Sequence, residues 1–141
     1  MKKVAKVIII ATVILILCLT LCACGSKYTS KYKAMLMVES NTSNKASVSF
    51  DTFSGVYVAQ LKNTGNNEVF ISYNATLKAG NIKVYYDFND EKQTLFEIGA
   101  DGAVEGKTEA FTGNKTIYII IEADGECGTG SFSFVLEKSQ Q

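Results

Sequence analysis

The segment Val69-Phe70-Ile71-Ser72-Tyr73-Asn74-Ala75-Thr76-Leu77-Lys78 decides the fold class of this chain. Val69, Ile71, Tyr73, Ala75 and Leu77 alternate with mostly polar residues, which is the two-residue period of a β-strand with one buried face. The same alternation recurs at Ala46 to Phe50, Ile82 to Phe88, Ile117 to Ile121 and Phe132 to Leu136. These alternating positions are predicted to form most of the core.

Turn-forming residues separate the alternating segments and set the predicted architecture. They lie at residues 63–67, 79–81, 89–90, 101–102, 112–114 and 124–125 and are rich in Gly, Asn and Asp, which tolerate positive φ angles. Eight or nine short strands with no helical period between them are typical of an antiparallel β-sandwich. We expect a jelly roll behind an N-terminal signal helix.

The N-terminus has the pattern of an export signal. Lys2, Lys3 and Lys6 precede an apolar run over residues 7–21. A helix over this run rises only about 22 Å, less than the roughly 30 Å hydrocarbon core of a bilayer. The lysines favour a cytoplasmic N-terminus, so the domain that follows is expected on the outer side of the membrane.

The residues Leu21-Cys22-Ala23-Cys24 resemble the lipobox of bacterial lipoproteins. The resemblance implies that signal peptidase recognises Leu21, Cys22 and Ala23. It also implies that Cys24 carries a covalent diacylglycerol, with fatty-acyl chains such as palmitate. No other cofactor is expected. Two acyl chains are needed for a stable anchor. The alternative is an uncleaved signal anchor in which these cysteines are ordinary small apolar residues.

Three regions follow from these observations. Residues 1–23 are the expected lipoprotein signal peptide, residues 24–33 a flexible tether without aliphatic side chains, and residues 34–141 the β-sandwich. The expected location is the extracytoplasmic face of the cell membrane.

Three segments of the domain resemble known small jelly-roll modules. The strand at residues 81–88 after a Gly turn, the strand Thr116 to Ile121, and the closing strand Gly130 to Leu136 follow the order of pre-peptidase C-terminal and carbohydrate-binding modules. The chain also resembles small uncharacterised lipoproteins of Gram-positive bacteria. It departs from the pre-peptidase pattern at Asn114-Lys115-Thr116-Ile117-Tyr118, so no binding residue is carried over from that family.

The composition excludes several functions. Residues 24–141 contain 11 Lys and 14 acids, and the chain has no Arg, which argues against a nucleic-acid partner. The absence of His and Trp removes the commonest general base and the largest sugar-stacking ring. We therefore expect a non-enzymatic binding or envelope accessory module, whose partner is a cell-wall glycan or an envelope protein.

The candidate ligand platform consists of three tyrosines that do not follow the alternation of the main apolar positions in their strands: Tyr57, Tyr85 and Tyr118. Exposed rings of this kind bind sugars or peptides, which gives the alternative of a carbohydrate-binding or adhesion module. Aromatic residues also occur in strands for packing, and the sequence does not decide which face each tyrosine occupies.

Two acidic groups have other candidate roles. Asp87, Asn89 and Asp90, followed by Glu91, offer hard oxygen ligands for a structural calcium ion, although a solvated turn has the same composition. Asp101 and Glu105 could supply paired carboxylates for an envelope hydrolase, the second alternative, if they converge in a cleft.

Cys127 is the only thiol that remains after Cys24 is acylated. A nucleophilic role needs a neighbouring base, and the chain has no His. A buried or idle cysteine is the expectation.

Overall fold

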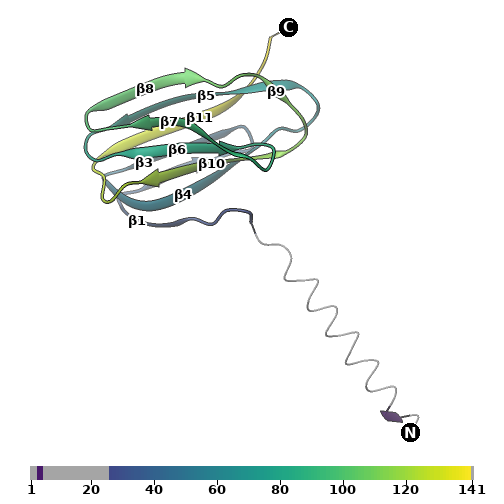
Figure 1. The fold of residues 1–141 in the computed structure, drawn as a ribbon, viewed down its shortest axis with the longest axis horizontal. Coiled ribbons are helices and arrows are strands. Elements are labelled where there is room, and N and C mark those ends of the chain that lie inside the picture. The colour runs from purple at the N-terminus through teal and green to yellow at the C-terminus, as the bar shows by residue number, and fades with distance from the viewer. Residues whose placement is uncertain (1–2, 5–25, 141) are drawn as a thin grey trace.

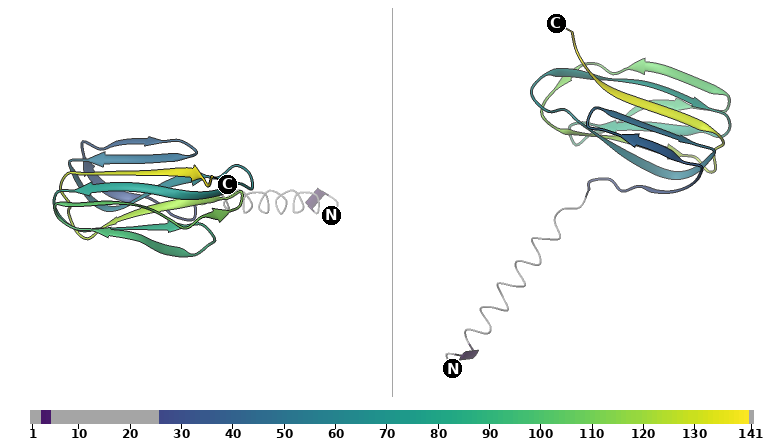
Figure 2. Two further views of the ribbon diagram at one scale, coloured as in Figure 1. Left: turned by 90° about the horizontal axis from the view of Figure 1, so that it is seen from above. Right: turned by 180° about the vertical axis from the view of Figure 1, so that it is seen from behind.

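The computed structural model describes residues 3–4 and 26–140 of the 141-residue chain. Residues 26–140 form eleven strands in two antiparallel sheets, so the predicted all-β sandwich of the jelly-roll type is confirmed. Figure 1 shows the strands running along the long axis of the domain, and Figure 2 shows the same layers from above and from behind. Within the described residues, no helix combines the length and the apolar character that crossing a bilayer requires.

Each sheet combines strands that are distant in sequence. The five-stranded sheet has the order β1 (Lys31–Met35), β4 (Thr52–Lys62), β10 (Thr116–Ala123), β6 (Ile82–Asp87) and β7 (Lys92–Ile98). The six-stranded sheet has the order β2 (Val38–Asn41), β3 (Lys45–Phe50), β11 (Gly130–Lys138), β5 (Glu68–Leu77) and β8 (Gly102–Lys107), with β9 (Phe111–Thr112) also paired to β5. Therefore β1 and β2 are edge strands, as are β7 and β8.

The core lies where the predicted alternation placed it. In β5, Val69, Ile71, Ala75 and Leu77 are buried, and Tyr73 packs against them from the margin. Most of the predicted inward positions of β3, β6, β10 and β11 are buried as well: Ala46, Val48, Phe50, Ile82, Val84, Ile117, Ile119, Ile121, Phe132, Phe134 and Leu136. Tyr86 and Phe88, predicted to be inward too, are only partly buried. Burial of each large apolar side chain stabilises the fold by about 1.5–3 kcal/mol.

The strand count exceeds the prediction of eight or nine, because three strands carry no clear alternation. All four residues of β2 are exposed, and β9 has only two residues. The strand β1 includes Lys31 to Lys33, so the prediction of a flexible tether through Lys33 is wrong at that end. The ring of Tyr32 explains this order, because it packs 5.9 Å from Phe53 and 5.8 Å from Tyr57, measured between ring centroids.

Gly55 allows β1 to join the sheet. It lies opposite Tyr32 in the ladder and has a φ of 99°. A Cβ at this position would overlap the carbonyl oxygen of Lys31 and lie 2.9 Å from the Cα of Tyr32. Only glycine combines this backbone conformation with such a close approach.

Candidate functional site

The outer face of the five-stranded sheet carries the polar and aromatic side chains that the core excludes. In the ladder, Ile120 of β10 lies between Val58 of β4 and Tyr85 of β6, and all three point outward because their neighbours in each strand pack in or against the core. Ile120 is nevertheless only 2% exposed. The side chain at the centre of this face is therefore closely covered, whereas Val58 and Tyr85 on either side of it are half-buried.

The N-terminal segment of the domain covers one end of this face. The Nζ of Lys27 lies 2.6 Å from an Asp87 carboxylate oxygen and 3.1 Å from Asp90, and the Tyr28 hydroxyl donates to the same Asp87 oxygen at 2.6 Å. The Tyr28 ring packs edge-on against Tyr118, with centroids 5.3 Å apart. We call Lys27, Tyr28 and Asp87 the latch.

The latch compensates a buried charge. Asp87 is 2% exposed, and burial alone raises the pKa of its carboxyl group. The hydrogen bonds from Lys27 and Tyr28 outweigh that effect, so the pKa of Asp87 falls below its ordinary value. The hydrogen bond to Asp87 likewise raises the pKa of the Lys27 ammonium. Both groups are therefore charged at neutral pH.

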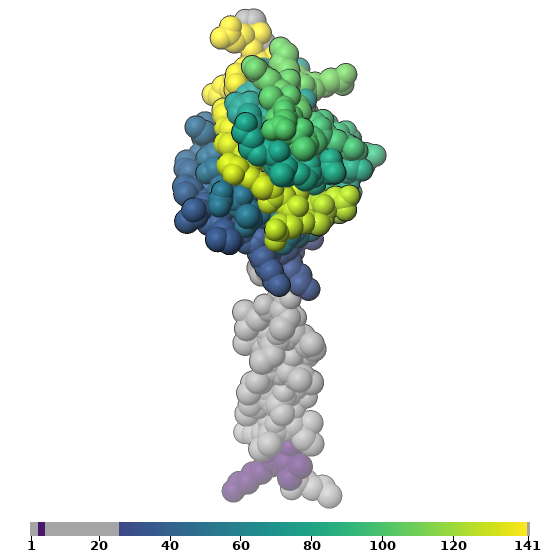
Figure 3. Space-filling view, turned by 90° about the vertical axis from the view of Figure 1, so that its left-hand side faces the viewer, coloured from purple at the N-terminus to yellow at the C-terminus, as the bar shows by residue number. Residues whose placement is uncertain are grey.

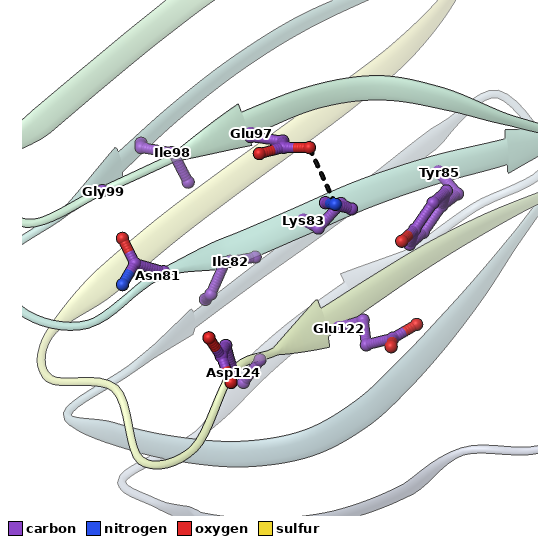
Figure 4. A pocket seen from close by; sticks show the side chains of 10 residues that line it. Asn81, Ile82, Lys83, Tyr85, Glu97, Ile98, Gly99, Glu122 and Asp124 are labelled. Atoms are coloured by element: carbon purple, nitrogen blue, oxygen red, sulfur yellow. Dashed lines mark ion pairs between the residues drawn. The ribbon is translucent and has the colours of Figure 1, made fainter.

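A hollow of about 540 Å³ occupies the other end of the face, over β6, β7 and the end of β10. Its lining residues are Asn81, Ile82, Lys83, Tyr85, Glu97, Ile98, Gly99, Glu122, Ala123 and Asp124. Figure 4 shows Tyr85 at one end of this hollow and Asn81 with Asp124 at the other. The hollow is thus bounded by an aromatic ring and by hydrogen-bonding groups.

Two ion pairs flank the ring. Lys83 and Glu97 lie 2.8 Å apart, as the dashed line in Figure 4 marks, and the hydrogen bond to Glu97 raises the pKa of Lys83. The Nζ of Lys92 lies 4.0 Å from the centroid of the Tyr85 ring and 3.5 Å from Glu122. The Lys92 ammonium therefore occupies one face of the Tyr85 ring.

The structure brings two of the three platform tyrosines together. Tyr118 lies opposite Asp87, and Tyr85 lies opposite Ile120, so the two tyrosines are diagonal neighbours on β10 and β6, about 7 Å apart in such a ladder. Tyr85 lines the hollow, whereas Tyr118 contacts the latch. They belong to one face but to different ends of it.

The assignment of Tyr57 to the platform is wrong. Tyr57 points into the sandwich and is 4% exposed, because it shares the inward parity of Ala59 and Leu61 in β4. Its hydroxyl accepts a hydrogen bond from the amide of Asn41, and burial raises its pKa to about 12. The error arose because Val56 and Val58 make the outward positions of β4 apolar too.

The candidate calcium ligands face cations supplied by the chain itself. The Lys27 ammonium lies between Asp87 and Asp90, where a metal ion would have to sit, and the Lys115 ammonium donates to Asn89 at 2.8 Å. Among the described residues, no cluster of three or more acidic, His or Cys side chains could hold a metal ion.

The candidate hydrolase carboxylates do not face each other across a cleft. Asp101 is exposed in the turn that precedes β8, with a φ of 54°. Glu105 is exposed on β8, opposite Asn74 of β5. Their positions give the hydrolase alternative no support.

The cysteines have separate outcomes. Cys127 is buried and lies 3.4 Å from the carbonyl oxygen of Asn81, and burial raises the pKa of its thiol, as expected for a buried cysteine without a nucleophilic role. Cys24, with Leu21, Cys22 and Ala23, lies outside the described residues.

Sequence reasoning missed most of the hollow and the latch. Glu97 and Glu122 resemble ordinary solvated positions of alternating strands, and only the pairing of β6 with β7 and β10 brings them to one place. Tyr28 and Tyr32 were the available signals, because aromatic rings are unusual in a polar tether. The buried Asn63, which donates to the carbonyls of Asn67 and Gly113, was likewise assigned to an ordinary turn.

Solved structures show what this fold is similar to. No protein-family profile and no curated protein sequence matches the chain. The structure of TmCBM61 in complex with β-1,4-galactotriose is 16% identical over 82% of this chain and 92% of that one, with a TM-score of 0.50. A CBM4 structure is 12% identical over 78% and 79% of the two chains, with a TM-score of 0.43. A family 29 carbohydrate-binding module is 17% identical over 81% and 80%, with a TM-score of 0.39. At this level of identity the shared feature is the β-sandwich fold.

Proposed function

We propose that the chain is lipid-anchored to the extracytoplasmic face of the cell membrane and that its β-sandwich binds a carbohydrate in the hollow beside Tyr85. The observation that carries this proposal is the Tyr85 ring at the margin of a hollow whose lining also includes five hydrogen-bonding side chains, those of Asn81, Lys83, Glu97, Glu122 and Asp124. A sugar presents apolar C–H groups on its ring faces and hydroxyl groups around its edge. An aromatic ring with converging polar groups complements both.

The chemistry of the hollow favours an uncharged, polyhydroxylated ligand. Each lysine at this end pairs with an acid, Lys83 with Glu97 and Lys92 with Glu122, and Asp124 adds one further acid. The small excess of negative charge disfavours an anionic ligand. Hydroxyl groups both donate and accept hydrogen bonds and therefore suit such mixed partners. Lys92 must leave the Tyr85 ring when a sugar stacks there, which its partly exposed, flexible side chain permits.

Comparison with TmCBM61 supplies a first ligand to test. That module has the same sandwich fold at a TM-score of 0.50 and was solved with β-1,4-galactotriose. A shared fold does not transfer a ligand. Galactotriose therefore serves here as a probe beside soluble cell-wall glycan fragments, and the proposal names carbohydrate as the ligand class.

The anchor is the second part of the proposal, and it rests on the sequence. The lipobox resemblance of Leu21 to Cys24 places diacylglycerol on Cys24 and leaves residues 24–141 as the mature chain. The module then displays its hollow at the membrane surface and acts by binding. Intact mass of the membrane-extracted chain tests this part, because diacylglycerol and loss of the leader both disappear in a Cys24→Ala version.

The glycan proposal is tested by calorimetric titration of the detergent-extracted protein with galactotriose and with cell-wall glycan fragments. Tyr85→Ala should weaken binding about tenfold or more, because a stacking ring is typically a dominant contact. Tyr118→Ala is the matched control, since that ring contacts Tyr28, and it should leave the affinity for a short oligosaccharide unchanged. Absence of binding to every glycan, or equal binding by Tyr85→Ala and the native chain, would contradict the proposal.

A further inference from the structure

The exposed large apolar side chains of the domain gather in one short segment. Within residues 26–140 they are Tyr32, Met35, Leu36 and Val38, which are 40%, 60%, 79% and 66% exposed. Single exposed apolar residues are ordinary, but a contiguous group marks a surface that meets an apolar partner. Leu36 also has a φ of 47°, a conformation that a bulky side chain rarely adopts, at the tip of the turn.

This segment forms one border of the sandwich, which we call the β1–β2 border (residues 31–41). The strand β1 is an edge of one sheet and β2 is an edge of the other, so neither has a neighbour on this side. Figure 1 shows β1 along the lower border, running from the N-terminal segment to the far end of the domain. In Figure 3 the earliest residues of the domain, coloured dark blue, likewise gather at its lower end.

The charges of the border match an anionic surface. Lys31 and Lys33 are exposed on β1, beside Met35. The acid of β2, Glu39, is exposed as well and interacts with the Tyr57 hydroxyl, so lysines outnumber acids by two to one within residues 31–41. Lysines next to exposed apolar side chains are typical of segments that lie in the interface of an anionic membrane.

The latch fixes the distance between this border and the lipid. Lys27 and Tyr28 are held by Asp87, and Ser30 accepts a hydrogen bond from the backbone of Val58 at 2.9 Å. Only residues 25 and 26 separate Cys24 from the latch, and the chain from Cys24 to Lys27 reaches about 10 Å at most. The latch end of the domain is therefore held near the membrane, and β1 starts beside this end at Lys31.

From this geometry we infer that the β1–β2 border docks on the surface of an anionic lipid bilayer. Met35 and Leu36 enter the boundary between headgroups and acyl chains, and Lys31 and Lys33 contact anionic headgroups. The inference rests on the proposed anchor at Cys24. Docking orients the outer face of the five-stranded sheet sideways, so the hollow beside Tyr85 stays open to a glycan.

The absence of tryptophan from the chain provides a clean test. The full chain carrying Leu36→Trp is reconstituted in vesicles of phosphatidylglycerol and phosphatidylcholine that contain a brominated phospholipid, which quenches only nearby indole rings. We expect a blue shift and strong loss of emission. Ala103→Trp, at an exposed position of the opposite edge strand β8, is the matched control and should keep the emission of a solvated indole.

Charge is tested separately from apolar contact. Lys31→Gln combined with Lys33→Gln in the Leu36→Trp chain should lower quenching in anionic vesicles to the level found in pure phosphatidylcholine. Added salt should have the same effect, because the interaction between the lysines and the headgroups is screened.

Several outcomes would overturn the inference. The first two are unquenched emission from Leu36→Trp and quenching equal to that of Ala103→Trp. The third is an unquenched blue shift whose size increases with protein density, which would mean that a second copy covers the border. Intact mass of the same samples reports lipid on Cys24 independently. If the Leu36→Trp indole is quenched in a chain without the lipid, the anchor is contradicted and the docking of the β1–β2 border is supported. If the chain carries the lipid and the indole is not quenched, the anchor is supported and the docking is contradicted.

Discussion

Lys27 and Asp87 are sixty positions apart in the sequence, yet the ammonium of one lies 2.6 Å from the carboxylate of the other. This pair, with the Tyr28 hydroxyl on the same carboxylate oxygen, attaches the start of the domain to the end of β6. Most of the Lys27 side chain is covered and Asp87 is almost fully covered, so the pair differs from an exposed surface ion pair.

Asp87→Asn should open the latch without unfolding the domain. The amide keeps the shape and can still accept from Tyr28, but it loses the charge that holds Lys27. We expect the change to weaken the attachment of residues 26–30, because the ion pair with Lys27 is lost. Amide hydrogen exchange should rise at Val58, whose N–H donates to the Ser30 hydroxyl oxygen, and stay unchanged in β10. Unchanged exchange at both places would contradict the role of the latch.

Acid should open the latch in the same way. Because the pKa of Asp87 is lowered in the folded protein, its contribution to stability is complete above the ordinary Asp value of 3.8 and is lost as pH falls through the lowered value. Exchange protection of the Val58 amide, corrected for intrinsic rates, should therefore be constant from neutral pH to about 5 and fall only below about 4. In Asp87→Asn this acid transition should be absent, and its persistence would assign the transition to another group.

Removal of the Tyr28 ring should lengthen the glycan platform. Tyr28 packs on Tyr118, the diagonal neighbour of Tyr85, so Tyr28→Ala exposes a second ring on the same face. Stacking on that ring should improve affinity for oligosaccharides long enough to reach it by about two- to tenfold. Monosaccharide affinity should not change. An equal gain for short and long ligands would indicate a general opening of the hollow instead, and calorimetric titration separates the two results.

The predictable part of this molecule is the part governed by a two-residue period. The alternation in β5, β10 and β11 identified the core correctly, because burial of one strand face constrains every second residue. The same rule failed for Tyr57, because both faces of β4 are apolar near Val56 and Val58. The alternation therefore does not show which residues of that strand point inward.

The candidate site was less predictable, because it depends on which strands become neighbours. The pairing of β6 with both β7 and β10 places Glu97 and Glu122 beside Tyr85, and no local pattern reports that pairing. The sequence indicated either a calcium ligand or a solvated turn at Asp87. The actual partner, Lys27, lies in a segment whose composition indicated a solvated tether.

A pair of glycines isolates the contribution of β1. Gly55 and Gly125 both have positive φ angles, 99° and 77°, so alanine is strained at either position. At Gly125 an added Cβ meets nothing within 4 Å, whereas at Gly55 it overlaps the Lys31 carbonyl of β1. Gly125→Ala should therefore cost only the backbone strain, about 1–2 kcal/mol. Gly55→Ala should cost more and should also release β1, with faster hydrogen exchange in residues 31–35. Equal losses in denaturant unfolding, with β1 still protected, would mean that β1 adapts to the added methyl group and that Gly55 serves only its own backbone conformation.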